Sequence, residues 1–283
     1  MRRQVMLMAL LAGMLAACGG AIRDGSSSTA RMTPTVQVRS SDGMPMVCVP
    51  GGTFSLAEAG GLSGRHDVTL SAYWIDQTEI TNAHYELCVE DGTCQPASNC
   101  VWGEPTYGDE IYTDHPVICV NWRMAQTYCA WAGGRLPTEA EWDYAARGPQ
   151  RSLYAWGDEF DGTLLNTCDV NCPHVDQRDA SFDDGYAMTA PAGSYPGGAS
   201  WCGALDMNGN VWEWVGDWYA PYTSGAVTDP TGPLSGEERV MRGGSWYDDV
   251  DFSRADHRHP YEPASSIYII GFRCVIPTED SGL

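Results

Sequence analysis

Basic residues are scarce in this chain, which has 16 Lys and Arg against 37 Asp and Glu and a formal net charge of −21 at pH 7. Nucleic acids and anionic membrane surfaces are bound through clusters of Lys and Arg, so this balance argues against both as partners. The acidity permits calcium sites, which are built from carboxylate and carbonyl oxygens. The alternative explanation of most of this negative charge is a solvated acidic surface that aids solubility.

The sequence also lacks common signatures of catalysis and of membrane spanning. It contains no HExxH, GxSxG or phosphate-loop motif. Its apolar run at residues 5–17 is shorter than the about 20 residues that a membrane-spanning helix needs. Because Arg2 and Arg3 precede this run, it has the form of an export signal.

The end of that signal resembles the lipobox of bacterial lipoproteins. Residues 15–18 read Leu-Ala-Ala-Cys, and in such proteins the cysteine is lipidated and becomes the new N-terminus. We predict a lipoprotein signal peptide over residues 1–17 and attachment to the membrane through lipid on Cys18. Gly19 is not the aspartate that retains some lipoproteins at the inner membrane, which favours the outer membrane, on its periplasmic or surface face. The alternative is an ordinary secretory signal with a chance cysteine.

The rest of the chain divides into a short linker and one domain. Residues 18–43 are rich in Ser, Thr and Gly and show no apolar period, which predicts a flexible tether. Residues 44–279 have the length of one domain with a substantial core.

Eleven cysteines are many for such a chain. Setting Cys18 aside leaves an even number in an oxidising compartment, which favours disulfides over zinc. Two pairs, Cys88 with Cys94 and Cys168 with Cys172, are close enough in sequence to form short local loops. No pair of CxxC motifs is present to indicate a zinc site.

The expected strands are short. Residues 46–54 predict an apolar strand that closes in a Pro-Gly-Gly turn, and the alternation of residues 68–75 predicts another. The chain after residue 148 is rich in Gly, Pro, Asp and Trp, which is typical of short strands joined by long loops that disulfides or metals hold in place. The fold class is α+β, with few helices and much irregular structure.

Three helices are expected from their capping residues. The first begins at Thr81 and the second near Asn121, because each residue can cap a helix whose apolar side chains follow at helical spacing. The third begins with the capping box of residues 138–141, Thr-Glu-Ala-Glu, and ends at Gly148.

Several segments together resemble the formylglycine-generating enzyme, or sulfatase-modifying factor, family. They occur in the family's order and cover nearly all of residues 44–276. The segments are Val49-Pro50-Gly51-Gly52-Thr53-Phe54, Glu79-Ile80-Thr81-Asn82, His115-Pro116-Val117, Gly134-Arg135-Leu136-Pro137-Thr138-Glu139-Ala140-Glu141-Trp142, Asn208-Gly209-Asn210-Val211-Trp212-Glu213-Trp214, Arg242-Gly243-Gly244-Ser245 and Gly271-Phe272-Arg273-Cys274.

The resemblance implies a fold and a disulfide. The family's fold is a variant of the C-type-lectin-like architecture, with little regular structure around small twisted sheets. Its members join the cysteine of a Tyr-Cys helix to the cysteine of the Gly-Phe-Arg-Cys end, and Cys129 and Cys274 occupy those places here. We therefore expect a disulfide between them.

The resemblance also implies two calcium ions. Asp206, Gly209, Val211 and Glu213 match one of the family's sites, and Asn166, Thr167, Asp184 and Tyr186 match the other. In each set two side chains and two backbone carbonyls supply oxygens, the ligands that calcium prefers. The alternative is that the aspartates only cap turns.

The family's copper ligands are missing. Its oxidase members hold Cu(I) between two cysteines a few residues after the Gly-Gly-Ser, since soft thiolates select that ion. Here residues 246–253 contain none, and no cysteine lies between Cys202 and Cys274. Copper as a cofactor, and copper-dependent formylglycine formation, are therefore not expected.

Two readings of function remain. The first is a noncatalytic, calcium-stabilised envelope module that binds a peptide, a glycan or an envelope protein, with a groove lined by aromatic residues among Trp201, Trp246, Tyr247, Tyr261 and Tyr268. The second is an oxidoreductase with a rebuilt noncopper metal site. Its ligands would be Asp248, His257 and His259, because imidazole and carboxylate suit iron or zinc.

Overall fold

A computed structural model of the chain describes residue 18, residues 32–57 and residues 65–278. The predicted signal peptide, and the part of the predicted tether before residue 32 other than Cys18, lie outside the described residues. The described helices are α1 (Asn82–Glu90), α2 (Trp122–Trp131) and α3 (Glu139–Arg147), with two 3-10 turns, η1 (Glu110–Tyr112) and η2 (Pro196–Gly198). The strands are β1 (Val36–Val38), β2 (Pro45–Val49), β3 (Gly52–Leu56), β4 (His66–Leu70), β5 (Tyr73–Asp76), β6 (Trp212–Trp218), β7 (Val227–Thr228), β8 (Arg239–Arg242), β9 (Arg258–Tyr261), β10 (Ile270–Phe272) and β11 (Val275–Pro277).

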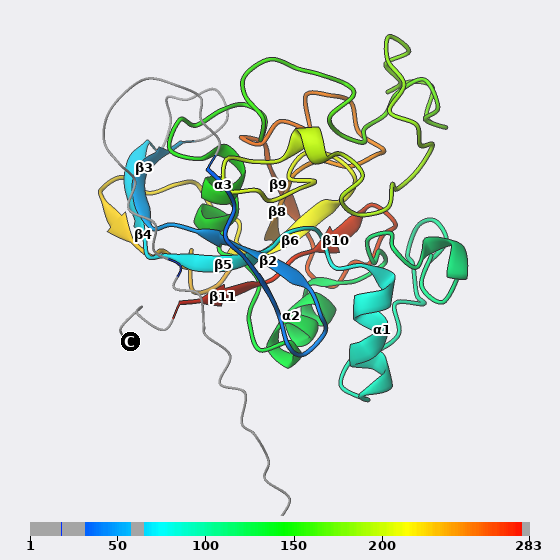
Figure 1. Cartoon of the computed structure of the whole chain (residues 1–283), viewed down its shortest axis with the longest axis horizontal. Helices are drawn as coiled ribbons and strands as arrows, with labels where there is room; N and C mark the ends of the chain where they lie inside the picture. The colour runs from blue at the N-terminus through cyan, green and yellow to red at the C-terminus, as the bar shows by residue number, and fades with distance from the viewer. Residues whose placement is uncertain (1–17, 19–31, 58–64, 279–283) are drawn as a thin grey trace, which may run out of the picture.

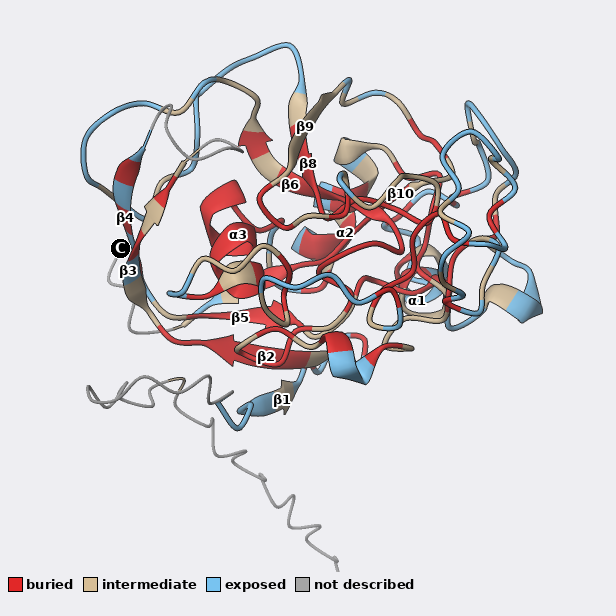
Figure 2. Cartoon of the chain, turned by 90° about the horizontal axis from the view of Figure 1, so that it is seen from above, coloured by how far each residue is buried: buried red, intermediate tan, exposed pale blue. Residues whose placement is uncertain are grey.

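These strands form three small sheets, in the orders β1-β2-β5-β11, β10-β6-β8-β9 and β3-β4-β7. The first sheet brings the beginning and the end of the domain together, because β11 pairs antiparallel with β5 (Figure 1). Helix α3 packs against β6 and β8 of the second sheet. The interior between sheets and helices is almost continuously buried (Figure 2). The α+β class predicted from the sequence is confirmed.

The three helices begin where the sequence predicts. The side chains of Thr81, Asn121 and Thr138 each accept a hydrogen bond from a backbone N–H in the first turn, and Thr138 completes a reciprocal capping box with Glu141. Helix α3 ends at Gly148, whose φ of 61° is a conformation that glycine adopts without a steric penalty.

The single strand predicted over residues 68–75 is wrong. The chain breaks at Ser71 and Ala72, so that β4 and β5 belong to different sheets. At this break Gly51 approaches so closely that an added Cβ would lie 2.7 Å from the carbonyl oxygen of Leu70. Alternation of apolar residues continues through the break and therefore cannot reveal it.

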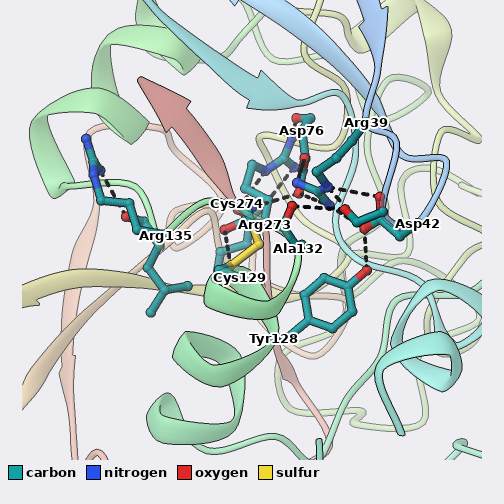
Figure 3. The surroundings of a disulfide bond; sticks show 12 residues. Arg39, Asp42, Asp76, Tyr128, Cys129, Ala132, Arg135, Arg273 and Cys274 are labelled. Carbon is teal, nitrogen blue, oxygen red and sulfur yellow. Dashed lines mark hydrogen bonds and ion pairs between the residues drawn. A yellow bond between two sulfur atoms is a disulfide. The ribbon is translucent and has the colours of Figure 1, made fainter. Parts of the chain in front are cut away.

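The prediction that the tether extends to residue 43 is also wrong. Strand β1 pairs with β2, and the guanidinium of Arg39 is buried against the carboxylates of Asp42 and Asp76, at 2.6 and 2.7 Å (Figure 3). Tyr128 of α2 donates to the same Asp42 carboxylate at 2.6 Å. The folded domain thus includes a segment whose polar composition suggested flexibility.

The disulfide predicted between Cys129 and Cys274 is present and ties α2 to the residue before β11 (Figure 3). The two local pairs predicted from spacing are present as well. A further bond joins Cys100 to Cys119, and Cys202 is unpaired and buried.

The remaining disulfide joins Cys18 to Cys48. A sulfur in a disulfide cannot carry the thioether of a lipid, so this bond and the predicted lipidation are alternative states of the Cys18 sulfur. Cys48 packs with Met46 and Trp74 on one face of β2 and β5, whereas Cys202 packs with Val47 on the other face. In the described part of the chain, no helix is both long and apolar enough to cross a membrane.

Candidate functional site

The loop of residues 245–253, after Gly243 and Gly244, is the place where the copper ligands would lie. Both glycines have positive φ, 99° and 75°, and an added Cβ on Gly244 would lie 2.7 Å from the Cα of Ser253. The loop therefore folds back on its own beginning, which only glycine permits at residue 244. This close return brings Asp248 and Ser253 to the same neighbour, Thr167.

The side chains of Asp248 and Ser253 in this loop are both engaged within the protein. Trp212 Nε1 donates to Asp248 Oδ2 at 2.8 Å, and the Ser245 hydroxyl donates to the same oxygen. Burial raises the pKa of Asp248 to about 6. The hydroxyl of Thr167 donates to the Asp248 carbonyl at 2.7 Å and lies 3.0 Å from the Oγ of Ser253, which is fully buried. These groups hold the loop in shape and present no thiolate.

The unpaired thiol of the described residues does not replace the missing pair. Cys202 is buried, and its sulfur lies 3.5 Å from the carbonyl oxygen of Ala145 in α3 and 3.3 Å from the hydroxyl of Ser200. Burial raises the pKa of this thiol above its usual value, so the thiolate form is disfavoured.

The structure does not assemble the rebuilt metal centre predicted from Asp248, His257 and His259. The two imidazoles lie side by side with ring centroids 6.3 Å apart, and each also contacts Trp212, whose indole holds the Asp248 carboxylate. Burial lowers the pKa of both histidines. Among the described residues, no three His, Cys, Asp or Glu side chains converge in a way that would hold a metal ion. The packing of the imidazoles on Trp212 accounts for these histidines.

Aromatic rings gather beside the loop. Tyr247 lies between His174, at 3.8 Å between centroids, and Tyr268, at 6.0 Å. Trp246, which the sequence places among candidate groove residues, is buried beneath them with 2% exposure. Trp201 instead packs on Tyr144 of α3. Sequence reasoning missed His174 as a member of this cluster, because nothing local links residue 174 to residue 247.

Tyr261, the other candidate groove residue, lies in β9 and packs near Trp214 and His259. Of the five predicted aromatic residues, only Tyr247 and Tyr268 are half-buried members of the cluster beside the loop.

The residues of one predicted calcium set lie together. Asp184 Oδ2 accepts the backbone N–H of Thr167, and Oδ1 accepts that of Tyr186, both at 2.9 Å. Asn166 has 1% exposure, and its Oδ1 is buried without a hydrogen-bond partner. Burial, with Asp169 and Asp183 nearby, raises the pKa of Asp184 to about 7. A buried amide oxygen without a donor is a group that a calcium ion could coordinate, and this set therefore fits the prediction.

The other predicted set surrounds a buried ion pair. Arg273 donates to both carboxylate oxygens of Glu213, at 2.7 Å each. Asp206 is buried beside them, and so is Glu79, which the sequence analysis did not include. Burial and the Asp206 charge raise the pKa of Glu79 well above its usual value, and Glu79 Oε2 has no hydrogen-bond partner. Arg273 already pairs with Glu213, and the raised pKa of Glu79 favours its uncharged form, so calcium binding by Asp206 and Glu213 stays a prediction.

Comparison with known proteins matches residues 32–278 to the Sulfatase-modifying factor enzyme 1-like domain. The chain belongs to this family. It is 33% identical over 302 residues to the formylglycine-generating enzyme of Streptomyces coelicolor, covering 88% of this chain and 93% of that protein. It is 34% identical over 190 residues to the inactive C-alpha-formylglycine-generating enzyme 2 of Mus musculus, covering 64% of this chain and 56% of that protein.

A solved structure agrees with this assignment. The sulfatase-modifying factor domain described here superposes on PvdO from Pseudomonas aeruginosa with a TM-score of 0.66 and 28% identity, covering 87% of this chain and all of that one. The predicted fold, a formylglycine-generating-enzyme-type variant of the C-type-lectin-like architecture, is confirmed. Within it, Asp248 and Ser253 stand in the loop that follows the family's Gly-Gly-Ser.

Proposed function

We propose that this sulfatase-modifying factor domain is a noncatalytic, calcium-stabilised binding module of the cell envelope, held to the membrane by lipid on Cys18. It would bind a peptide, a glycan or an envelope protein. The observation that carries the proposal is the engagement of Asp248 and Ser253 in hydrogen bonds to Trp212 and Thr167. The family's loop is kept, but its polar groups stabilise the fold instead of offering a soft metal site.

Calcium has a structural role in this proposal. Asn166, Thr167, Asp184 and Tyr186 would hold one ion, and Asp206, Gly209, Val211 and Glu213 would hold the other. Bound calcium supplies positive charge that compensates buried carboxylates and links loops that have little regular structure. The aromatic cluster of Tyr247, Tyr268 and His174 would remain available as a contact surface because these rings are only partly buried.

Lipid attachment has a distinct chemical signature. With Cys18 lipidated, Cys48 has no partner, because Cys202 lies on the other face of β2. The denatured lipidated protein should therefore react with two equivalents of maleimide, and the nonlipidated protein with one. Mass spectrometry of the N-terminal peptide distinguishes the two forms. A maleimide count of one in a protein purified from membranes by detergent would contradict lipid attachment at Cys18.

The noncatalytic assignment is tested by copper and aldehyde assays on the purified domain. We expect no tight Cu(I) binding in competition with a chromogenic chelator, and no aldehyde from a sulfatase-type cysteine peptide. The double variant Asp248→Cys/Ser253→Cys is the positive comparison, since it would place two thiols in the loop that follows the Gly-Gly-Ser segment, where the family's copper ligands are expected. It should gain Cu(I) binding. Aldehyde formation by the unmodified protein would overturn the proposal.

A further inference from the structure

A cavity of about 530 Å³ lies away from the loop of residues 245–253. It is bounded by the β3-β4-β7 sheet, the N-terminal end of α3 and the segment that follows β6. Its walls are mainly apolar and include Leu56, Val227, Trp218, Pro221 and Pro230. A cavity of this volume is large enough for an amino-acid side chain together with the backbone atoms on either side of it.

One acidic side chain in the cavity has a carboxylate oxygen that accepts no hydrogen bond from the described residues. Asp217, in β6, is 7% exposed and lines the cavity. Its Oδ2 accepts the backbone N–H of Glu139 at 2.8 Å, whereas Oδ1 accepts no hydrogen bond from the described residues. The backbone at Gly232, with φ of 71°, approaches this oxygen so closely that an added Cβ would lie 2.6 Å from it. A carboxylate oxygen in a cavity that accepts no hydrogen bond from the protein is free to accept one from a ligand, and a charged donor makes the stronger bond.

The neighbouring acid, Glu139, is not available to a ligand in the same way. Its carboxylate receives hydrogen bonds from Arg242, from two nitrogens of Arg258 and from the hydroxyl of Tyr222. Asp217 forms no such ion pair with the residues that the structure describes. Burial first, and then the charge of Glu139, raise the pKa of Asp217 to about 7. Asp217 is therefore the acid in this cavity that lacks a direct ion pair among the described residues, and Arg258 offsets its charge only in part.

We infer that this cavity binds a primary ammonium group on an unbranched apolar stem, of the kind that a lysine side chain presents, with the ammonium on Asp217 Oδ1 and the stem along Trp218 and the apolar walls. An ammonium supplies both the missing hydrogen bond and the missing positive charge. A sugar hydroxyl supplies only the former, and a carboxylate ligand is repelled. The chain itself contains no lysine, so neither its own side chains nor those of a second copy provide the group. The inference does not depend on the proposed function of the Asp248 loop.

Calorimetric titration at pH 8 with Nα-acetyl-lysine N-methylamide tests this inference on the full domain. The Nε-acetylated analogue is the matched ligand, since it keeps the stem and removes the charge. We expect binding of the lysine probe, and at least tenfold weaker binding of the acetylated analogue. Asp217→Asn should lose at least tenfold in affinity, because it keeps the acceptor for Glu139 N–H and removes the negative charge.

Two further variants separate the site from general effects. Asp67→Asn removes an exposed carboxylate from β4 and should bind the probe as the unmodified protein does. Gly232→Ala keeps Asp217 and obstructs its Oδ1, and should also weaken binding at least tenfold. Equal affinity for both ligands, or equal affinity of Asp217→Asn and the unmodified protein, would overturn the inference. So would tighter binding of methyl glucoside than of the lysine probe, or no binding of the probe up to about 10 mM, which corresponds to about −2.7 kcal/mol.

The source of the ammonium is resolved by comparing n-butylamine with a lysine-containing tetrapeptide on the same protein. Similar affinities indicate a site for free amines, and at least tenfold tighter binding of the peptide indicates a lysine of a protein partner. Both results support an ammonium site, provided that Asp217→Asn binds each ligand at least tenfold more weakly than the unmodified protein does. These variants lie outside the loop of residues 245–253, so we expect them to leave the copper and aldehyde assays unchanged. A negative result in the lysine titration would therefore not count against the proposed function.

Discussion

Arg273 lies against Glu213 with two hydrogen bonds of 2.7 Å, and neither side chain is more than 1% exposed. The pair joins the segment between β10 and β11 to the first residues of β6. Trp142 of α3 donates to the same Glu213 carboxylate at 2.8 Å, so that a helix, a central strand and the C-terminal segment meet at one group.

Replacing Arg273 by Met should destabilise the domain by about 3–5 kcal/mol, because it leaves buried carboxylates without their guanidinium. Glu213, Asp206 and Glu79 would then all lack a positive neighbour. Urea unfolding followed by tryptophan fluorescence measures the change. Arg254→Met removes a half-buried arginine whose ion pair among the described residues is with Asp256, and it should change stability by less than about 1 kcal/mol. Equal effects of the two variants would contradict this account.

Removing the disulfide between Cys129 and Cys274 by a double Ser substitution should cost about 5 kcal/mol in the chain-entropy model, since the bond closes a loop with a sequence separation of 145. The matched variant removes the bond between Cys88 and Cys94, whose separation is 6, and should cost about 2.4 kcal/mol in the same model. Denaturant midpoints of the two variants test the order, and a larger loss for the local bond would contradict it.

Calcium removal should lower the melting temperature by about 5–10 °C, if calcium is initially present at about a hundred times its dissociation constant. Asp184→Asn should reduce this sensitivity to chelator, since it removes the buried carboxylate of one predicted set. Asp183→Asn is the matched control, because Asp183 is the exposed neighbour. Differential scanning fluorimetry with and without chelator measures the shifts. A domain whose melting temperature ignores chelator would refute the calcium proposal.

The pH dependence of stability should differ between the unmodified protein and Asp217→Asn. The pKa of Asp217 is raised from 3.8 to about 7 in the folded protein, mainly because burial opposes its ionisation. Glu139 and Glu141 add to this increase and Arg258 opposes it. Ionisation of Asp217 therefore favours the unfolded chain, and its stability penalty grows as the pH rises from about 4 to 7 and stays complete above 7.

Consequently Asp217→Asn should be more stable than the unmodified protein by roughly 2–4 kcal/mol at pH 8, and the two proteins should converge near pH 4. Chemical unfolding at a series of pH values without ligand gives the comparison. A constant difference across this range would show that Asp217 does not titrate in this way.

Local signals in the sequence predicted the helices correctly. Thr81, Asn121 and Thr138 act within one turn of their own positions, so their capping roles are encoded by a few adjacent residues. The disulfide between Cys129 and Cys274 is not a local feature, and it was predicted from the family resemblance. The same resemblance identified the loop that contains Asp248 as the place of the family's copper ligands.

Features that depend on contacts distant in sequence were missed or wrong. The burial of Arg39 depends on Asp76, and the role of Glu79 depends on Asp206 and Arg273, none of which a short window contains. His257 and His259 suggested metal ligands from their spacing, but spacing does not report that Trp212 packs against both rings. The close approach of Gly232 to the Asp217 carboxylate likewise depends on residues far apart in sequence.

The bond between Cys129 and Cys274 also determines how the domain would respond to an extracellular protease. A single cleavage in any surface loop between these cysteines leaves both fragments covalently connected, so the nicked protein keeps its mass under nonreducing conditions. Strand β11 would remain beside β5 after such a cut, because the bond holds the residue just before it.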